Sequence, residues 1–277
     1  MTQRSILITG CSSGIGYDAA TTLHAQGWQV FATCRQEADC LRLQGEGLRS
    51  FVLDYASSES VLEGARRALN ETNGRLDALF NNGAYGIPGL VEDLPRNALR
   101  AIFETNLFGQ FELINALIPS MRENRQGHII NCSSVLGFCA LPNRGAYNST
   151  KFAMEGLSDT LRLELHNTNI HTVLIEPGPI GTKIRVNSQP HFEKWIDVEN
   201  SVNKAHYQTK VIPRLYETDG KKDKFELPSS AVTDVLLKAL NSSKPKPRYY
   251  VTTPTRFAGV LKRMLSTSLF DQFFVER

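Results

Sequence analysis

Several features that would assign this sequence to a special class are missing from it. The chain has 277 residues, and none of its apolar runs reaches the roughly 18 residues that a membrane-spanning helix needs. Its first ten residues contain neither the apolar stretch nor the cleavage site of a signal peptide. There is no internal repeat and no low-complexity segment. We therefore expect a globular protein with a cytoplasmic location.

Cysteine and net charge are also low. Five scattered cysteines form no CxxC pair and no cluster with ligand spacing, which is typical of reduced structural thiols and predicts no metal site. The net charge is only +3, so no nucleic-acid partner is expected. The hydrophobic content of 41% is enough for the core of one large α/β domain.

Short apolar runs alternate with helical patterns along the chain. Strands are predicted at 5–9, 28–34, 49–53, 76–80, from 129, at 170–176 and at 249–252. Helices are predicted to about residue 26, at 58–70, as one long helix at 95–121, from Tyr147, and at 229–241. This order predicts a single doubly wound Rossmann-type domain over 1–277, with a parallel sheet of about seven strands and helices on both faces.

A glycine-rich turn follows the first strand. Gly10, Gly14 and Gly16 have the spacing G-x-x-x-G-x-G, with Ser12, Ser13 and Ile15 between them. Glycine lets a ligand approach the backbone closely, and the N–H groups at the start of the next helix can bind a phosphate. An ordinary turn would hardly require three glycines, so the pattern predicts a dinucleotide site.

The second strand does not end in an acid. Cys34 stands where a dinucleotide fold specific for NAD carries an acid for the ribose, and Arg35 follows it. An arginine can form a charge-assisted fork on a 2′-phosphate. We therefore expect NADP(H) as the cofactor, with a solvated surface arginine as the alternative.

The ends of the third and fourth strands carry polar residues. Asp54 can accept a hydrogen bond from an adenine amino group, or it can stabilise a turn or helix start, and both interpretations remain open. Asn82 and Gly83 follow the fourth strand and are expected to face the crevice where the strand order reverses, unless they only form a turn.

The residues from 129 to 155 bring a possible acid–base group together. Ser134 follows a strand, and Tyr147 and Lys151 lie one turn apart on the next helix. An ammonium about 4 Å from a phenolate stabilises it by roughly 4 kcal/mol. That could bring the pKa of Tyr147 from about 10 to roughly 7. Ser134 could then hold a substrate oxygen, whereas an incidental Tyr–Lys pair is the alternative.

Two further segments complete the candidate site. Asn106 is an amide on an otherwise apolar helix face, either as a structural cross-link or as a water-holding member of a proton relay. The sixth strand ends in a turn that contains Pro177, Gly178, Ile180 and Thr182. Backbone groups of this turn could hold a carboxamide, and Thr182 could reach a phosphate.

Taken together, these motifs resemble the short-chain dehydrogenase/reductase superfamily over roughly the first 190 residues. The Thr-Gly-Cys-Ser-Ser-Gly-Ile-Gly opening and the Glu-Pro-Gly-Pro-Ile-x-Thr turn are most similar to the retinol- and 17β-hydroxysteroid-dehydrogenase-like branch and to bacterial NADP-dependent aldehyde reductases. One departure is visible, because the usual Asn-Asn-Ala-Gly is Asn-Asn-Gly-Ala at 81–84. This swap puts Gly83 in doubt as a cofactor contact.

The resemblance implies specific roles. Tyr147 is the acid/base, and Lys151 lowers its pKa and binds the nicotinamide ribose. Ser134 positions the substrate oxygen in preference to its neighbour Ser133. Asn106 holds the water that links Lys151 to solvent, and Ile180 lies against the nicotinamide carboxamide.

Two C-terminal segments have no motif of their own. Residues 184–227 read as a long, irregular segment that corresponds to the family's substrate lid. Either its apolar residues line a pocket or some of them only anchor the lid; they are Ile184, Val186, Phe192, Trp195 and Ile196. Residues 253–277 form an amphipathic extension that either contacts a membrane surface or, as we would favour, docks on the body or on a second subunit.

The expected function is NADP(H)-dependent interconversion of an apolar aldehyde or ketone and its alcohol. One alternative is oxidation of a sterol- or retinoid-like alcohol. A non-catalytic NADP(H)-binding sensor is an alternative of another class, which the complete Asn, Ser, Tyr and Lys set argues against. The expected partners are the small apolar substrate and a second copy of the chain, as a homodimer or homotetramer.

Overall fold

The protein is built on one seven-stranded parallel sheet. The computed structural model describes residues 3–217 and 222–273. The strands have the order β3-β2-β1-β4-β5-β6-β7, and each pairs in parallel with its neighbours. Their bounds are β1 Ser5–Thr9, β2 Gln29–Cys34, β3 Arg49–Val52, β4 Ala78–Asn81, β5 Gly127–Cys132, β6 Ile170–Glu176 and β7 Arg248–Tyr250. The doubly wound sheet expected from the sequence is confirmed.

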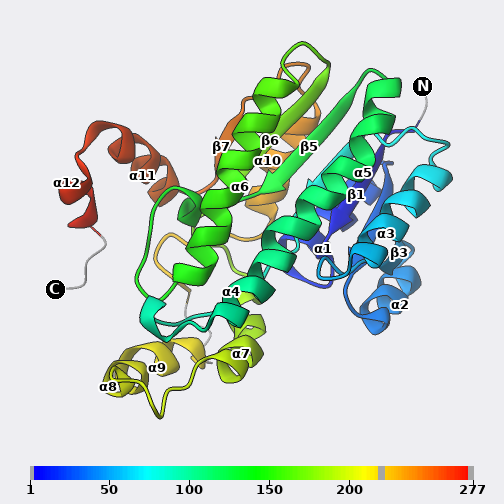
Figure 1. Cartoon of the computed structure of the whole chain (residues 1–277). Helices are drawn as coiled ribbons and strands as arrows, with labels where there is room; N and C mark the ends of the chain where they lie inside the picture. Colours follow the sequence, from blue (N-terminus) through cyan, green and yellow to red (C-terminus); the bar gives the residue numbers. More distant parts are fainter. Residues whose placement is uncertain (1–2, 218–221, 274–277) are drawn as a thin grey trace.

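Alternating side chains of the strands divide the core into two halves. Ile6 and Ile8 of β1 point to one face of the sheet, where they pack with α1, α2 and α10. Leu7 points to the other face and packs with α3 and α5. The covering helices, seen on the two sides of the sheet in Figure 1, are α1 Gly14–Ala25, α2 Glu37–Gly45, α10 Ser230–Leu240, α3 Ser58–Glu71, α5 Gly109–Glu123 and α6 Gly145–Glu164.

The expected long helix at 95–121 is present, but its interior is not uniform. It consists of α4 Arg96–Phe103, a π-helical turn at Glu104–Phe108, and α5. The π turn contains Asn106, which is fully buried. Single π turns inside α-helices are frequent at functional sites because they change the direction of side chains locally.

The segment expected to be irregular is mostly helical. Within 184–217 the chain forms α7 Ile184–Trp195, α8 Lys204–His206, a π turn at Tyr207–Val211 and α9 Ile212–Leu215, drawn in yellow in Figure 1. Residues 218–221 of the proposed lid lie outside the described residues. The expectation of an irregular lid was wrong for these residues, since α7 forms with Pro190 inside it.

The C-terminal segment leaves the sheet after β7. Helices α11 Thr253–Met264 and α12 Thr267–Asp271 stand to one side of the body in Figure 1. The last residues of the predicted extension, 274–277, lie outside the described residues.

Candidate active site

The glycine-rich loop has a backbone that only glycine accommodates easily. Gly10 and Gly14 have φ angles of +69° and +61°, in the left-handed region. A Cβ atom on Gly10 would lie 2.7 Å from the backbone of Gly83, and one on Gly16 would meet the carbonyl oxygen of Gly10 and the amide of Asn82. The loops after β1 and β4 are therefore in direct contact, as a phosphate-binding turn requires.

The residues of this cradle fit a dinucleotide. Helix α1 begins at Gly14, so its free N–H groups face the loop. Thr182 lies across from it, since a Cβ on Gly14 would be 3.3 Å from the Thr182 side chain. The glycine loop and the turn after β6 therefore lie side by side, and the contact of Thr182 with a phosphate stays a prediction. Ile15 and Ile180 pack on the apolar core beneath it.

The side chain of Asn82 makes contacts within the protein, while its predicted contact with a cofactor stays a prediction. Its side-chain amide donates to the carbonyl oxygens of Thr9, at 3.0 Å, and Gly10, at 3.3 Å. It therefore holds the glycine loop in place. The Gly83 carbonyl accepts a hydrogen bond from Gln110 at 2.8 Å. The Gly–Ala order at 83–84 suits this packing because position 83 is the one that meets Gly10.

Arg35 is exposed directly after β2. Its positive charge lowers the pKa values of both Tyr85 and His191, although burial is the largest influence on each, and the net pKa of Tyr85 is raised to about 12. Tyr85 and His191 stack with ring centroids 3.7 Å apart. Arg35 follows the carboxyl end of β2, and carboxyl ends of strands form the crevice side of a doubly wound sheet.

Asp54 closes a turn in this structure. Its carboxylate accepts from the Ala56 N–H at 3.0 Å, and its carbonyl accepts from Ser57. This geometry favours the turn interpretation over the adenine contact.

The position of Arg42 beside the glycine-rich loop was not predicted from the sequence. Its guanidinium donates to the Ser12 carbonyl at 2.8 Å and pairs with Glu46. Helix α2, which carries Arg42, was not predicted, so nothing in the sequence placed this cation beside the glycine loop. Ser13 precedes α1 without a side-chain cap bond.

The predicted acid–base group does converge. Ser134 follows β5, and its hydroxyl, which accepts a hydrogen bond from the Leu136 N–H at 3.1 Å, lies near enough to the Tyr147 phenol to lower the pKa of that phenol. Lys151 is buried, with its Nζ atom 5.6 Å from the Tyr147 ring centroid and donating to the Cys132 carbonyl at 2.7 Å. Ser133 is buried on the side of Glu155, so Ser134 is the serine at the tyrosine.

The pKa of Tyr147 moves in the opposite direction from the predicted one. Burial raises it above its usual value, and the nearby Ser134 hydroxyl only partly offsets this. Burial also lowers the pKa of Lys151 to about 8. The prediction failed because it counted the attraction of the lysine and not the loss of water around both groups.

Asn106 is a structural cross-link. Its side chain accepts from the Tyr85 N–H at 3.1 Å, donates to the Tyr85 carbonyl at 2.8 Å and donates to Thr150 at 3.3 Å. It thus joins the π turn, the loop after β4 and helix α6. A role in holding water stays a prediction.

The turn after β6 is tied to the serine loop. The Pro177 carbonyl accepts from the Val135 N–H at 2.8 Å. A Cβ on Gly178 would collide with Thr252. The turn after β6 and the Ser134 loop are therefore held next to each other.

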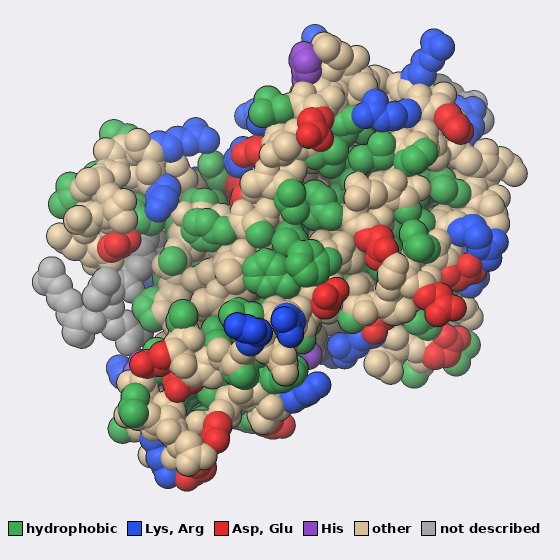
Figure 2. Space-filling view, in the orientation of Figure 1, with side chains coloured by type: hydrophobic (Ala, Val, Ile, Leu, Met, Phe, Trp, Pro, Cys, Tyr) green, Lys and Arg blue, Asp and Glu red, His purple; other side chains and the backbone are tan. Residues whose placement is uncertain are grey.

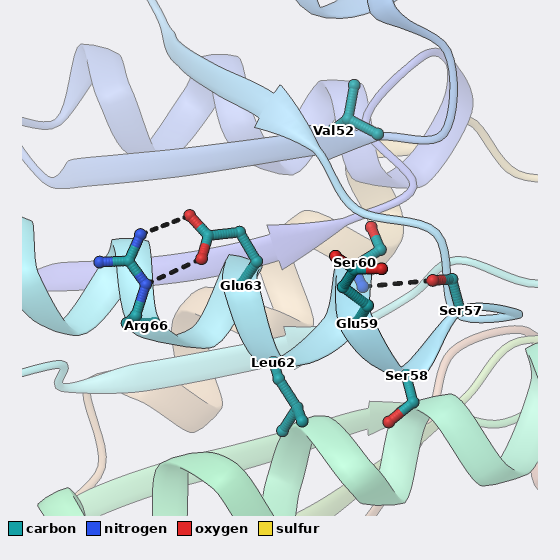
Figure 3. Close-up of a pocket in the computed structure, with 8 residues that line it drawn as sticks. All are labelled: Val52, Ser57, Ser58, Glu59, Ser60, Leu62, Glu63 and Arg66. Carbon is teal, nitrogen blue, oxygen red and sulfur yellow. Dashed lines mark hydrogen bonds and ion pairs between the residues drawn. The ribbon is translucent and has the colours of Figure 1, made fainter.

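One surface hollow lies away from these residues. It lies on helix α3, where Glu63 pairs with Arg66 and Ser57 caps Ser60 (Figure 3). None of the candidate catalytic or cofactor-binding residues lines it.

Residues 4–192 match the short chain dehydrogenase family. The chain belongs to this family. It is 37% identical to the uncharacterized oxidoreductase YbbO of Escherichia coli K12 over 270 residues, covering 98% of this chain and 93% of that protein.

Two human relatives place the chain in the retinol- and hydroxysteroid-dehydrogenase-like branch of the short-chain dehydrogenases. Human 17-beta-hydroxysteroid dehydrogenase type 1 is 30% identical, over 96% of this chain and 82% of its own length. Human retinol dehydrogenase 8 is 38% identical, over 65% of this chain and 60% of its own length. A short-chain dehydrogenase structure from Streptomyces avermitilis superposes with a TM-score of 0.78, with 26% identity and coverage of 95% and 94% of the two chains.

Proposed function

We propose that this short-chain dehydrogenase interconverts an apolar aldehyde or ketone and its alcohol, with NADP(H) as cofactor and Tyr147 as acid/base. The observation that carries the proposal is that the buried Lys151 has its Nζ atom 5.6 Å from the Tyr147 ring centroid, with Ser134 beside the phenol. The bound cofactor would supply or accept the hydride.

The side chains then have distinct tasks. Tyr147 holds the proton at its phenol oxygen and gives it to the substrate oxygen during reduction. Ser134 keeps the phenol and that oxygen in line. Lys151, whose pKa of about 8 leaves it charged at neutral pH, stabilises the phenolate that forms and would hold the nicotinamide ribose.

The pKa of Tyr147 supports the direction of reduction. Since burial keeps the phenol protonated around neutral pH, the group is ready to donate. A general acid of this kind contributes about 10²–10⁴-fold to the rate.

An apolar substrate is supported by the packing around Tyr147. The tyrosine lies against a hydrophobic cluster that includes Ile87 and Ile102, together with Phe192 and Ile196 of the proposed lid. Phe192 and Ile196 are buried and anchor the lid, whereas Ile184 and Val186 are exposed. The last two are therefore the candidates for contact with a substrate chain.

The experiment is a steady-state assay with NADPH and straight-chain aldehydes of increasing length. At about 0.8 kcal/mol per buried methylene, kcat/KM should rise with length and then level off, and Tyr147→Phe should abolish turnover while leaving NADPH binding intact. A flat series would overturn the apolar pocket, and near-normal turnover by Tyr147→Phe would overturn the acid.

The cofactor preference has its own test. Arg35 lies on the crevice side, and hydrogen bonds to charged groups are worth about 1.5–3 kcal/mol. Wild type should prefer NADPH over NADH by roughly ten-fold or more, and Arg35→Ala should lose most of that preference by weaker NADPH binding. Arg49→Ala, at another exposed arginine, is the matched control. An Arg35→Ala enzyme with undiminished preference would exclude Arg35 as the determinant.

A second candidate is oxidation of a sterol- or retinoid-like alcohol. It is favoured by the names of the two human relatives, a retinol dehydrogenase and a hydroxysteroid dehydrogenase. Assays with NADP⁺ and such alcohols, run beside the aldehyde series, would decide between them.

We also propose a cytoplasmic homodimer or homotetramer. Hydrophobic side chains gather over the central helices in Figure 2, and Phe108, Phe152 and Leu157 are 52%, 43% and 44% exposed. An apolar surface of this kind is typical of a subunit contact. Sedimentation of the purified chain would measure its subunit count.

A further inference from the structure

Helix α11 buries small side chains and exposes several of its large apolar ones. The residues that it buries are small, namely Thr255, Ala258 and Gly259. Gly259 packs so closely on Tyr250 that a Cβ there would lie 2.7 Å from the ring. The face of α11 that packs on the body thus consists of small residues. A rotation of the helix about its axis that buried another face would break the contact between Gly259 and Tyr250.

Three of its large apolar side chains point outward instead. Phe257, Val260 and Met264 recur at helical spacing and are 66%, 53% and 75% exposed. In α12, Leu269 and Phe273 are 50% and 64% exposed. These side chains therefore do not dock on the body of their own chain; docking on a second subunit, the other form of the interpretation that the sequence favoured, stays a prediction.

The charge of helix α11 has one sign, whereas α12 ends in one exposed acid, Asp271. Helix α11 carries Arg256, Lys262 and Arg263 and no acid. Both arginines are exposed, and hydrophobic and basic side chains appear together on the α11–α12 lobe in Figure 2. An amphipathic helix with bulky apolar residues and arginines is suited to the boundary between lipid headgroups and acyl chains.

The two helices are held beside the catalytic loop. Leu261, Leu265 and Phe270 pack with Val135 and Cys139, which lie between Ser134 and Tyr147. A surface that binds α11 and α12 would thus lie close to the loop that carries the catalytic serine.

We infer that α11 and α12 dock this protein on an anionic lipid surface. Phe257, Val260 and Met264 enter the acyl boundary, and Arg256 and Arg263 meet the phosphates. Among the described residues no helix is long and apolar enough to cross a bilayer, so the contact is peripheral. This inference rests on the exposed surface and not on the proposed reaction.

A second copy fits this face less well. A two-fold axis through α11 would bring the arginines of one copy toward those of the other, because such an interface uses the same patch twice. The exposed apolar side chains on α6 and the adjoining π turn offer a separate surface for a subunit contact.

The test is co-sedimentation of the full chain with phosphatidylcholine vesicles with and without phosphatidylserine. Wild type should bind the anionic vesicles, and less at high salt. Phe257→Ser with Met264→Ser should weaken binding by at least about 100-fold. Arg256→Gln with Arg263→Gln should weaken it by about 25-fold, at about five-fold per arginine.

Leu41→Ser with Leu62→Ser is the matched control, because these leucines are 57% and 50% exposed on helices α2 and α3. It should bind as wild type does. Wild type that stays in solution with anionic vesicles would overturn the inference, as would full binding by both double variants of α11. If the Phe257 and Met264 changes alter the sedimenting mass of the protein alone and vesicles do not bind, the face is a subunit interface.

Discussion

Helix α6 carries two buried ionisable side chains one turn apart, and their surroundings are opposite. Lys151 is a single cation whose Nζ atom donates to a backbone carbonyl. Glu155 belongs to a group of three carboxylates, with Asp159 and Glu176, that share the guanidinium of Arg248 at 2.6–3.2 Å. We call this group the Arg248 cluster.

Both regions contain strongly shifted pKa values. Burial lowers the pKa of Lys151 to about 8 and raises that of Glu176 to about 9, with the charge of Glu155 adding to the second. Three carboxylates facing one nearby guanidinium favour retention of a proton at neutral pH. Yet only Lys151 lies beside a group that could touch substrate. A shifted pKa therefore marks burial of charge in both places, and only the region of Lys151 is also a candidate for chemistry.

The largest expected effect is on the free energy of unfolding, and it distinguishes the Arg248 cluster from the region of Lys151. Arg248→Met leaves the carboxylates without their cation and should lower the free energy of unfolding by about 3–5 kcal/mol. Chemical denaturation would measure it. Adding Glu176→Gln removes one carboxylate and should restore part of the loss. An Arg248→Met protein as stable as wild type would show that the cluster needs no cation.

A substitution of Lys151 should instead lower the activity. Lys151→Met removes the charge that stabilises the phenolate, about 4 kcal/mol at 4 Å, so kcat should fall by roughly 100- to 1000-fold. Stability should not fall, since a desolvated cation gives way to an apolar chain of similar shape. Single-turnover kinetics and thermal unfolding, measured on the same sample, would check both. A strong loss of stability would make Lys151 structural and erase the contrast.

The smallest expected effect tests whether the Arg248 cluster influences the pKa of Lys151. Carbonyl reduction in wild type should decline as the pH rises through about 8, where Lys151 loses its charge. The negative charge of Glu155 raises the pKa of Lys151, so Glu155→Gln should move this decline to lower pH, by about one unit or less. The pH profile of kcat would measure it. An unmoved profile would mean that Glu155 holds the shared proton and carries no charge.

Much of the frame could be predicted from local sequence signals. Strands 5–9 and 170–176 were placed to the residue, because buried parallel strands are short apolar runs that end in turn residues. Ser134, Tyr147 and Lys151 converge as predicted, since strand ends and helical spacing determine their positions.

What could not be predicted depends on contacts between distant segments. Helix α2 has a mixed, charged surface with little periodicity, so Arg42 could not be placed at Ser12. The pKa direction of Tyr147 depends on burial by the lid and by α4, which spacing does not reveal. The exposure of Phe257 and Met264 depends on Gly259 fitting against Tyr250, a contact between small surfaces that an apolar stripe does not predict.

The strand order also sets a sequence of events during synthesis. β1 can pair with β2 as soon as both have been synthesised. Its other neighbour is β4, so the pairing of Ile6 with Ala78 can form only after residue 78 has been synthesised. Until that point the growing chain presents one open edge of β1, with Leu7 uncovered on the face that α3 and α5 later close. Contacts of such long sequence separation make a parallel sheet slow to complete. A chain that ends before residue 78 would therefore have an incomplete sheet with an unpaired edge at β1. Such a fragment is expected to aggregate or to be degraded.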